Sequence, residues 1–184
     1  MILDYFVQFT GGSASPGNND QATDSPTTGT QTSSNQIDLH MSGIPVLANL
    51  QGARDMGIGD QPALKLLVQV TTTFLTGTNL NVALQGATDN GSGLPAAFST
   101  WYTSPTVATA QLTVGLRLMD MDVPRPPPGI AIPRFLQLQY VTTGSAMTAG
   151  KIRGNIVLDR YDQYYSSTVN SVSGGYPPGI AIAN

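Results

Sequence analysis

The sequence contains no glutamate and no cysteine, and lysine occurs only at Lys65 and Lys151. Glu and Lys usually fill the exposed faces of helices, so their scarcity argues against a helical protein. Thr, Ser, Asn, Gln and Gly are abundant instead, and these residues suit strands and turns. The lack of cysteine excludes a disulfide framework and a thiolate site. The composition therefore predicts an all-β protein.

Charge is also scarce, because only 10% of the 184 residues are charged and the formal net charge is −3. A surface that neutralises phosphates clusters Lys and Arg, so we expect no nucleic-acid partner. Two long stretches without charge, Leu66–Thr88 and Asn90–Leu116, are interrupted by Thr, Asn and Gln. Such interruptions argue against membrane spans. The chain is long enough to bury the core of one domain.

Alternating apolar and polar residues predict a series of half-buried antiparallel strands. One such strand is Leu64–Phe74, in which every second residue faces the core: Leu66, Val68, Val70, Thr72 and Phe74. The segment Thr76–Thr78 is short enough for a hairpin to the next strand, Asn79–Gln85. Further strands are expected at Met1–Phe9, Ile37–Leu39, Phe98–Tyr102, Val107–Val114, Leu116–Met119, Arg134–Thr142 and Lys151–Asp159.

Eight or nine short strands predict a two-sheet antiparallel β-sandwich, and a jelly roll is the commonest eight-strand arrangement. Amides occupy the outward positions, as at Gln85 and Gln137. The predicted sandwich spans residues 1–160. Within it, Gly11–Asn35 is almost entirely polar and is expected to be a long surface loop or a partly disordered stretch.

Residues 161–184 are predicted to be an extended C-terminal arm that contacts a neighbour. Tyrosines are enriched in interfaces, prolines lower the entropy lost on docking, and alternate isoleucines suit strand addition. The interface candidates are Tyr161, Tyr164, Tyr165, Tyr176, Pro177, Pro178, Ile180 and Ile182. The alternative is that the arm closes an edge of its own sandwich.

The hexapeptide Pro-Pro-Gly-Ile-Ala-Ile occurs twice, at Pro127–Ile132 and Pro177–Ile182. Each copy is expected to be a stiff extended lead-in followed by a short apolar edge strand.

The inventory of reactive side chains predicts a protein that is not an enzyme. His40 is the single histidine, and no nucleophile motif accompanies it. The carboxylate pairs Asp120/Asp122 and Asp159/Asp162 lie at predicted strand ends beside arginines, where solvation explains them. We expect no cofactor.

Two further segments allow more than one interpretation. Asp89–Ser92 resembles the start of a calcium loop, but the chain has no Glu to complete it, so a β-turn is favoured and no metal is expected. Trp101 and Tyr102 could form a carbohydrate-stacking platform, although a core position is favoured for the tryptophan.

Three blocks of residues follow one another in a characteristic order. They are Asn35–Leu39, then Ala53–Asp60 leading into Leu64–Val70, then Arg134–Val141 through Thr148–Ile152 to Val157–Asp159. With the opening Met1–Asp4, this order resembles the capsid cement (decoration) protein family of tailed bacteriophages, the group named from a short-tailed Bordetella phage.

The resemblance implies a non-enzymatic jelly-roll protein that binds the outer surface of an icosahedral phage head, after synthesis in the host cytoplasm. Its partner would be the major capsid protein, whose adjacent subunits it would clamp. The strand edges and arms predict self-association, with a homodimer favoured and a trimer possible. Arg54 is then a candidate to reach a capsid carboxylate, although a local ion pair with Asp55 is the alternative.

Two other classes of function stay open. One is a tail- or spike-associated carbohydrate-binding module that uses Trp101 and Tyr102. The other is a small hydrolase whose site the sequence does not reveal.

Overall fold

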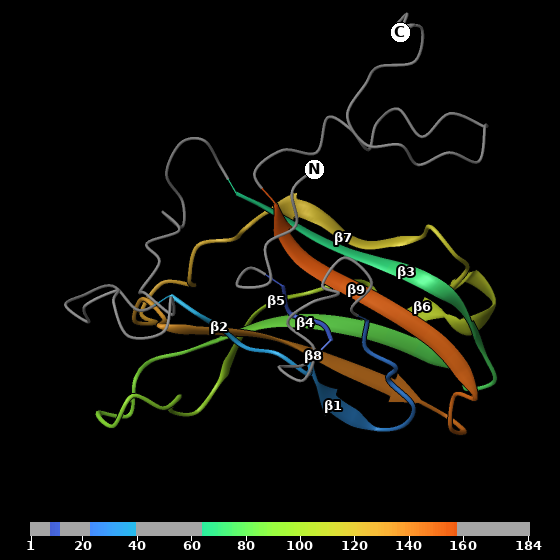
Figure 1. The fold of residues 1–184 in the computed structure, drawn as a ribbon, viewed down its shortest axis with the longest axis horizontal. Coiled ribbons are helices and arrows are strands. Elements are labelled where there is room, and N and C mark those ends of the chain that lie inside the picture. Colours follow the sequence, from blue (N-terminus) through green and yellow to red (C-terminus); the bar gives the residue numbers. More distant parts are fainter. Residues whose placement is uncertain (1–7, 12–22, 40–63, 158–184) are drawn as a thin grey trace, which may run out of the picture.

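The computed structural model of the chain describes residues 8–11, 23–39 and 64–157. These residues form two antiparallel sheets stacked as two layers (Figure 1). The larger sheet has the strand order β1-β8-β4-β5, with β2 also paired to β8 and β6 to β4; the smaller has the order β7-β3-β9. The predicted all-β antiparallel sandwich is therefore confirmed.

The longest strands are β3 at the centre of the smaller sheet, β4 and β8 at the centre of the larger sheet, and the edge strand β9. The strand bounds are β1 Thr30–Thr32, β2 Ile37–Asp38, β3 Lys65–Leu75, β4 Asn79–Ala87, β5 Ser99–Thr103, β6 Val107–Ala108, β7 Arg117–Asp122, β8 Phe135–Thr143 and β9 Ala149–Val157. The predicted strands match these elements, except where described below and where they extend beyond the described residues.

The core lies between the two sheets and is built from the alternate residues of the central strands. Its fully buried members include Phe9, Leu66, Val68, Val70, Leu80, Val82, Leu84, Leu136, Leu138, Tyr140 and Ile152. The layers approach closely at Gly154 of β9, where an added Cβ would lie against the Leu138 side chain and press on it. Glycine at this inward position lets the two sheets meet.

The predicted hairpin at Thr76–Thr78 is wrong. Strand β3 pairs with β7 and β9, whereas β4 pairs with β5, β6 and β8, so the turn crosses from one sheet to the other. The β8–β9 connection crosses in the same way (Figure 1). At each of these turns, the two joined strands have an apolar face that packs into the core between the sheets. The two strands therefore do not pair with each other in one sheet. This repeated exchange between sheets is the connectivity expected of a jelly-roll-like sandwich.

Two smaller expectations also differ from the structure. The predicted strand Val107–Val114 stops after Ala108, where a 3-10 turn begins at Thr109–Gln111, and Val114 is exposed. Thr72 is exposed although it was expected to face the core, because the register of β3 against β9 shifts between Val70 and Thr72. A bulge of this kind breaks the strict alternation on which the prediction relied.

The outward amides form a ladder across the larger sheet. Gln137 donates through Nε2 to Gln85 Oε1 at 2.8 Å, and Gln36 Nε2 donates to Gln137 Oε1 at 3.0 Å. Gln85 Nε2 in turn donates to Thr100 Oγ1 at 3.2 Å. Contrary to the expectation of exposed amides, Gln137 and Gln85 are only 4% and 7% exposed. Since each amide satisfies the next, the row is buried without a large desolvation cost.

Part of the polar stretch between residues 11 and 35 is not the surface loop that was expected, because Thr30–Thr32 forms strand β1 on β8 and Asp24 is tied to the sandwich. Asp24 accepts hydrogen bonds through its carboxylate from Tyr140 Oη at 2.8 Å, Ser34 N at 3.0 Å and Gly11 N at 3.1 Å. Its backbone pairs with Ile152 of β9. Burial, together with the Asp24 carboxylate, raises the pKa of Tyr140 well above its ordinary value, so this phenol stays a donor.

Candidate functional site

The interface candidates from the sequence lie outside the described residues. They are Arg54, Asp55, Tyr161, Tyr164, Tyr165, Tyr176, Pro177, Pro178, Ile180 and Ile182. His40, Asp159 and Asp162 also lie outside them. The roles assigned to these residues stay predictions, and the site described below is built from other residues.

Two long connections leave the same end of the sandwich, which we call the loop end (left in Figure 1). Residues 88–98 join β4 to β5, and residues 123–134 join β7 to β8. Backbone hydrogen bonds fasten the second connection, since Arg134 N donates to Ala87 O at 2.9 Å and Leu39 N donates to Arg134 O at 2.6 Å. The loop end therefore brings together three segments that are distant in sequence.

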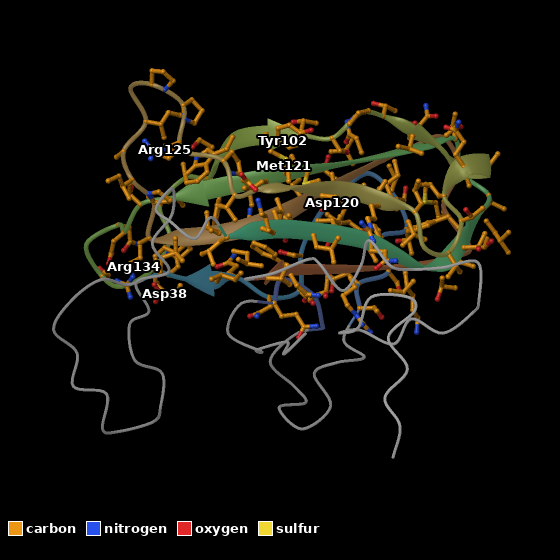
Figure 2. The ribbon with its side chains drawn as sticks, turned by 90° about the horizontal axis from the view of Figure 1, so that it is seen from above. Asp38, Tyr102, Asp120, Met121, Arg125 and Arg134 are labelled. Atoms are coloured by element: carbon orange, nitrogen blue, oxygen red, sulfur yellow. The ribbon has the colours of Figure 1, made fainter. Side chains whose placement is uncertain are left out.

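Arg134 is the electrostatic centre of the loop end. Its Nε and Nη2 donate to the two oxygens of Asp38, both at 2.9 Å, and its Nη1 pairs with Asp89. Its guanidinium carbon also lies 4.8 Å from the centroid of the Phe135 ring. Figure 2 shows Arg134 beside Asp38, with Arg125 on the loop that projects from the same end. The hydrogen bond to Asp38, then that to Asp89, raises the pKa of Arg134 above its ordinary value.

Asp89 begins a turn in which its own side chain holds the backbone. Its Oδ1 accepts hydrogen bonds from Gly91 N at 2.7 Å and Gly93 N at 3.0 Å, while its Oδ2 faces Arg134. Asp89–Ser92 is thus part of a bend held by side-chain to backbone hydrogen bonds, in keeping with the expected turn. Within the described ranges, no group of three His, Asp or Glu side chains could hold a metal ion.

Asp120 and Asp122 each pair with a base of their own. Asp120 Oδ2 accepts from Arg117 Nη1 at 2.7 Å, and Asp122 pairs with Lys65 across the β3–β7 ladder. The carboxylates serve as partners of cations on the outer face of the smaller sheet. This arrangement supports the structural interpretation of the pair.

Trp101 and Tyr102 pack against the hydrophobic core from β5. The indole lies so close to Gly86 of β4 that a Cβ there would overlap it. Trp101 therefore packs against the core, as favoured, but it lies at the core margin and stays partly exposed. Its indole Nε1 is buried and has no hydrogen-bond partner among the described residues.

The loop end carries large apolar side chains that the core does not use. Ile132 is 77% exposed, Leu94 61% and Ile130 39%. The edge strand predicted within Pro127–Ile132 is wrong, because these residues lie outside every strand and form a turn. Sequence reasoning had singled out this hexapeptide as a repeat but had not placed it at an exposed end.

The chain is thus an antiparallel β-sandwich protein with apolar residues displayed on loops at one end. It belongs to the Bbp16 family, whose model matches residues 21–156. The family is named after a Bordetella phage protein, so the predicted relation to a Bordetella-phage-type family is confirmed. No curated protein matches the sequence. Among the described residues, no helix has the length and apolar character needed to cross a membrane.

Proposed function

We propose that this chain is a structural, non-enzymatic virion protein that cements the phage head. It binds the outer surface of the icosahedral shell and clamps adjacent major capsid subunits. Membership of the Bbp16 family across residues 21–156 carries the proposal, because the family is phage-related. The resemblance of the ordered sequence blocks to capsid cement proteins supplies the specific role.

The chemistry of the larger sheet supports this role. The outward positions of its central strands β4 and β8 that are at least partly exposed carry no charge: Asn79, Asn81, Gln139, Val141 and Thr143. Amides and hydroxyls can exchange water for protein partners with less desolvation cost than ions. Many copies around a closed shell would turn modest single contacts into durable attachment.

The same proposal gives the sequence candidates their roles. Arg54 contacts a capsid carboxylate, and residues 161–184 reach a neighbouring subunit. Before assembly we expect the free protein to be a homodimer, with a trimer as the alternative, which light scattering during size-exclusion chromatography distinguishes.

Binding to purified heads tests the function directly. Heads from a phage that lacks this gene product are mixed with the purified chain and sedimented, with the heat-unfolded chain as control. We expect saturable co-sedimentation at a fixed ratio to the major capsid protein, and heads that withstand heating better. Failure of the folded chain to sediment with the heads would contradict the proposal.

Two variants then test the assigned contacts. Replacing Arg54 by Ala should weaken head binding and leave the melting temperature nearly unchanged, whereas equal losses of both would indicate a local ion pair with Asp55. Deleting residues 174–184 should preserve folding and remove head binding or self-association. Much earlier melting of the truncated chain would show that the arm covers its own domain.

A further inference from the structure

Five large apolar side chains are exposed among the described residues, and they gather at opposite ends of the sandwich. Leu94, Ile130 and Ile132 lie at the loop end, whereas Leu75 and Val114 lie at the other. Ile132 is the most exposed of the five, at 77%. Ile130 and Ile132 are also the two closest in sequence, and exposed apolar residues that lie together mark an interaction site more often than single ones do.

The segment that carries Ile130 and Ile132 has its shape encoded in its own sequence. Ile130 N donates to Pro127 O at 3.1 Å, and Gly129 has a φ of 84°. Proline at the second position and a glycine with positive φ at the third define a type II turn. Ile130 is therefore the last residue of a turn that needs little further ordering when it binds, and Ile132 follows two residues later.

The two ends of this loop are also fixed. Pro133 is buried, and the following Arg134 is locked by Asp38 and Asp89. Val123, at the start of the loop, is buried, and its N–H donates to Leu64 O at 2.9 Å. The exposed isoleucines thus sit on a loop anchored at both ends, which favours a preformed contact over a flexible one.

The same six residues occur a second time in the chain, at Pro177–Ile182. Packing within the sandwich does not explain the first copy, because Ile130 and Ile132 are exposed there. The fold does not bury the first copy, and the chain nevertheless contains the hexapeptide twice. Recognition of the same target by both copies best explains this repetition.

We propose that Pro127–Ile132 is a docking motif that inserts Ile130 and Ile132 into an apolar pocket on the shell subunit. Pro177–Ile182 is a second copy of that motif, for an equivalent pocket. The inference rests on the proposed function and names the surface by which the chain holds the head. Two linked motifs raise the effective concentration of each for its pocket, so the pair binds far more tightly than either alone.

The size of the motif favours a pocket on a larger partner over self-association. A stable protein–protein interface buries about 1,200–2,000 Å² in total, which two isoleucine side chains do not approach. Isoleucines that enter a pocket instead act as anchors within a larger contact. The partly exposed, uncharged positions of β4 and β8, such as Asn79, Gln139 and Thr143, would add to such a contact.

The decisive variant replaces Ile130 and Ile132 together by Ser, in the full-length chain. Its control is Leu75→Ser with Val114→Ser, two residues of similar exposure, 55% and 64%, at the opposite end. We expect head binding to weaken at least about tenfold for the loop variant and to stay within about twofold for the control. Both should melt with the wild type. A free Pro-Pro-Gly-Ile-Ala-Ile peptide should displace the wild-type chain from heads, and a scrambled peptide should not.

The other possible results show which of the two proposals, the docking motif or the cement role, is wrong. If the wild type binds heads and the loop variant binds equally well, the docking motif is wrong and the cement role stands. If the wild type does not bind heads, both proposals are wrong. If the loop variant changes the oligomeric state of the free chain and leaves head binding intact, the partner is a second copy and the inference fails. Should the loop variant melt early, failure of the peptide to compete would overturn the inference instead.

Discussion

The two ends of the sandwich are held together by different kinds of interaction. At the loop end, Arg134 joins Asp38 and Asp89 through charged hydrogen bonds. We call the opposite end the arch end, after the turns 76–78 and 144–148 that cross between the sheets. There, hydrogen bonds between neutral groups join the segments. Thr76 Oγ1 donates to Ala146 O at 2.7 Å and accepts from Thr148 N at 2.9 Å. The contribution of the loop end to stability should therefore depend on salt and pH. The contribution of the arch end should depend on how its side chains pack.

The largest expected effect comes from shape at the arch end. Gly150, the second residue of β9, has a φ of 128°, and an added Cβ would overlap the ring of Phe74. Gly150→Ala should destabilise the fold by about 2–4 kcal/mol, because it combines backbone strain with overpacking. Urea unfolding measures the loss. The control Gly115→Ala, at a φ of 91° with open space around it, should cost only about 1 kcal/mol. Equal losses would mean that Phe74 is not in the way.

Replacing Arg134 at the loop end should have the next largest effect on stability. Arg134→Met keeps an apolar stem near Phe135 but leaves two carboxylates without their shared partner. We expect a loss of about 1–2 kcal/mol, limited by the exposure of Asp38. The loss should shrink in about 1 M NaCl, where screening is strong. A loss that salt does not change would indicate packing of the arginine stem as its cause.

The neutral counterpart at the arch end is Thr76→Val. This change keeps the branched shape and removes the hydroxyl that bridges residues 146 and 148. We expect a loss of about 1 kcal/mol that is the same at low and high salt. A salt-dependent loss would remove the distinction between the two ends.

The smallest effect should be seen in acid. Desolvation raises the pKa of Asp89, but hydrogen bonds from Gly91, Gly93 and Arg134 outweigh it, so the pKa is lower than its ordinary value of 3.8. A lowered carboxyl pKa contributes stability above the ordinary value and loses it as pH falls through the folded-state pKa. Wild type and Asp89→Asn should therefore differ at neutral pH and converge in strong acid. Urea unfolding across pH tests this, and a constant difference would contradict it.

The sequence predicted the strands well because their apolar residues repeat every second position. The alternation found β3, β4, β5, β8 and β9 closely. Alternation does not tell which strands pair with each other, and the prediction that depended on strand pairing was wrong. Thr76–Thr78 has the length of a hairpin loop, yet β3 and β4 face each other across the core, and only long-range packing decides between these arrangements.

The candidate site shows the same limit. Arg134 and Asp89 were visible in the sequence as a strand start and a turn, but 45 residues separate them. Their meeting depends on β4 lying beside β8. The Pro127–Ile132 string was recognised as a repeat, whereas its exposure follows from its place between β7 and β8, which only the fold determines.

The pairing of distant strands also has a consequence for biosynthesis. β3 pairs with β7 on one side but completes its pairing only when β9, 149–157, exists, and β4 pairs with β5 but likewise needs β8, 135–143. Contacts this far apart in sequence form slowly, because a long loop must close before any of them is gained. A chain emerging from the ribosome therefore has no finished sheet until nearly all of its described strands are outside the exit tunnel. The larger sheet can therefore close only once residue 143 is available, and the smaller sheet only once residue 157 is.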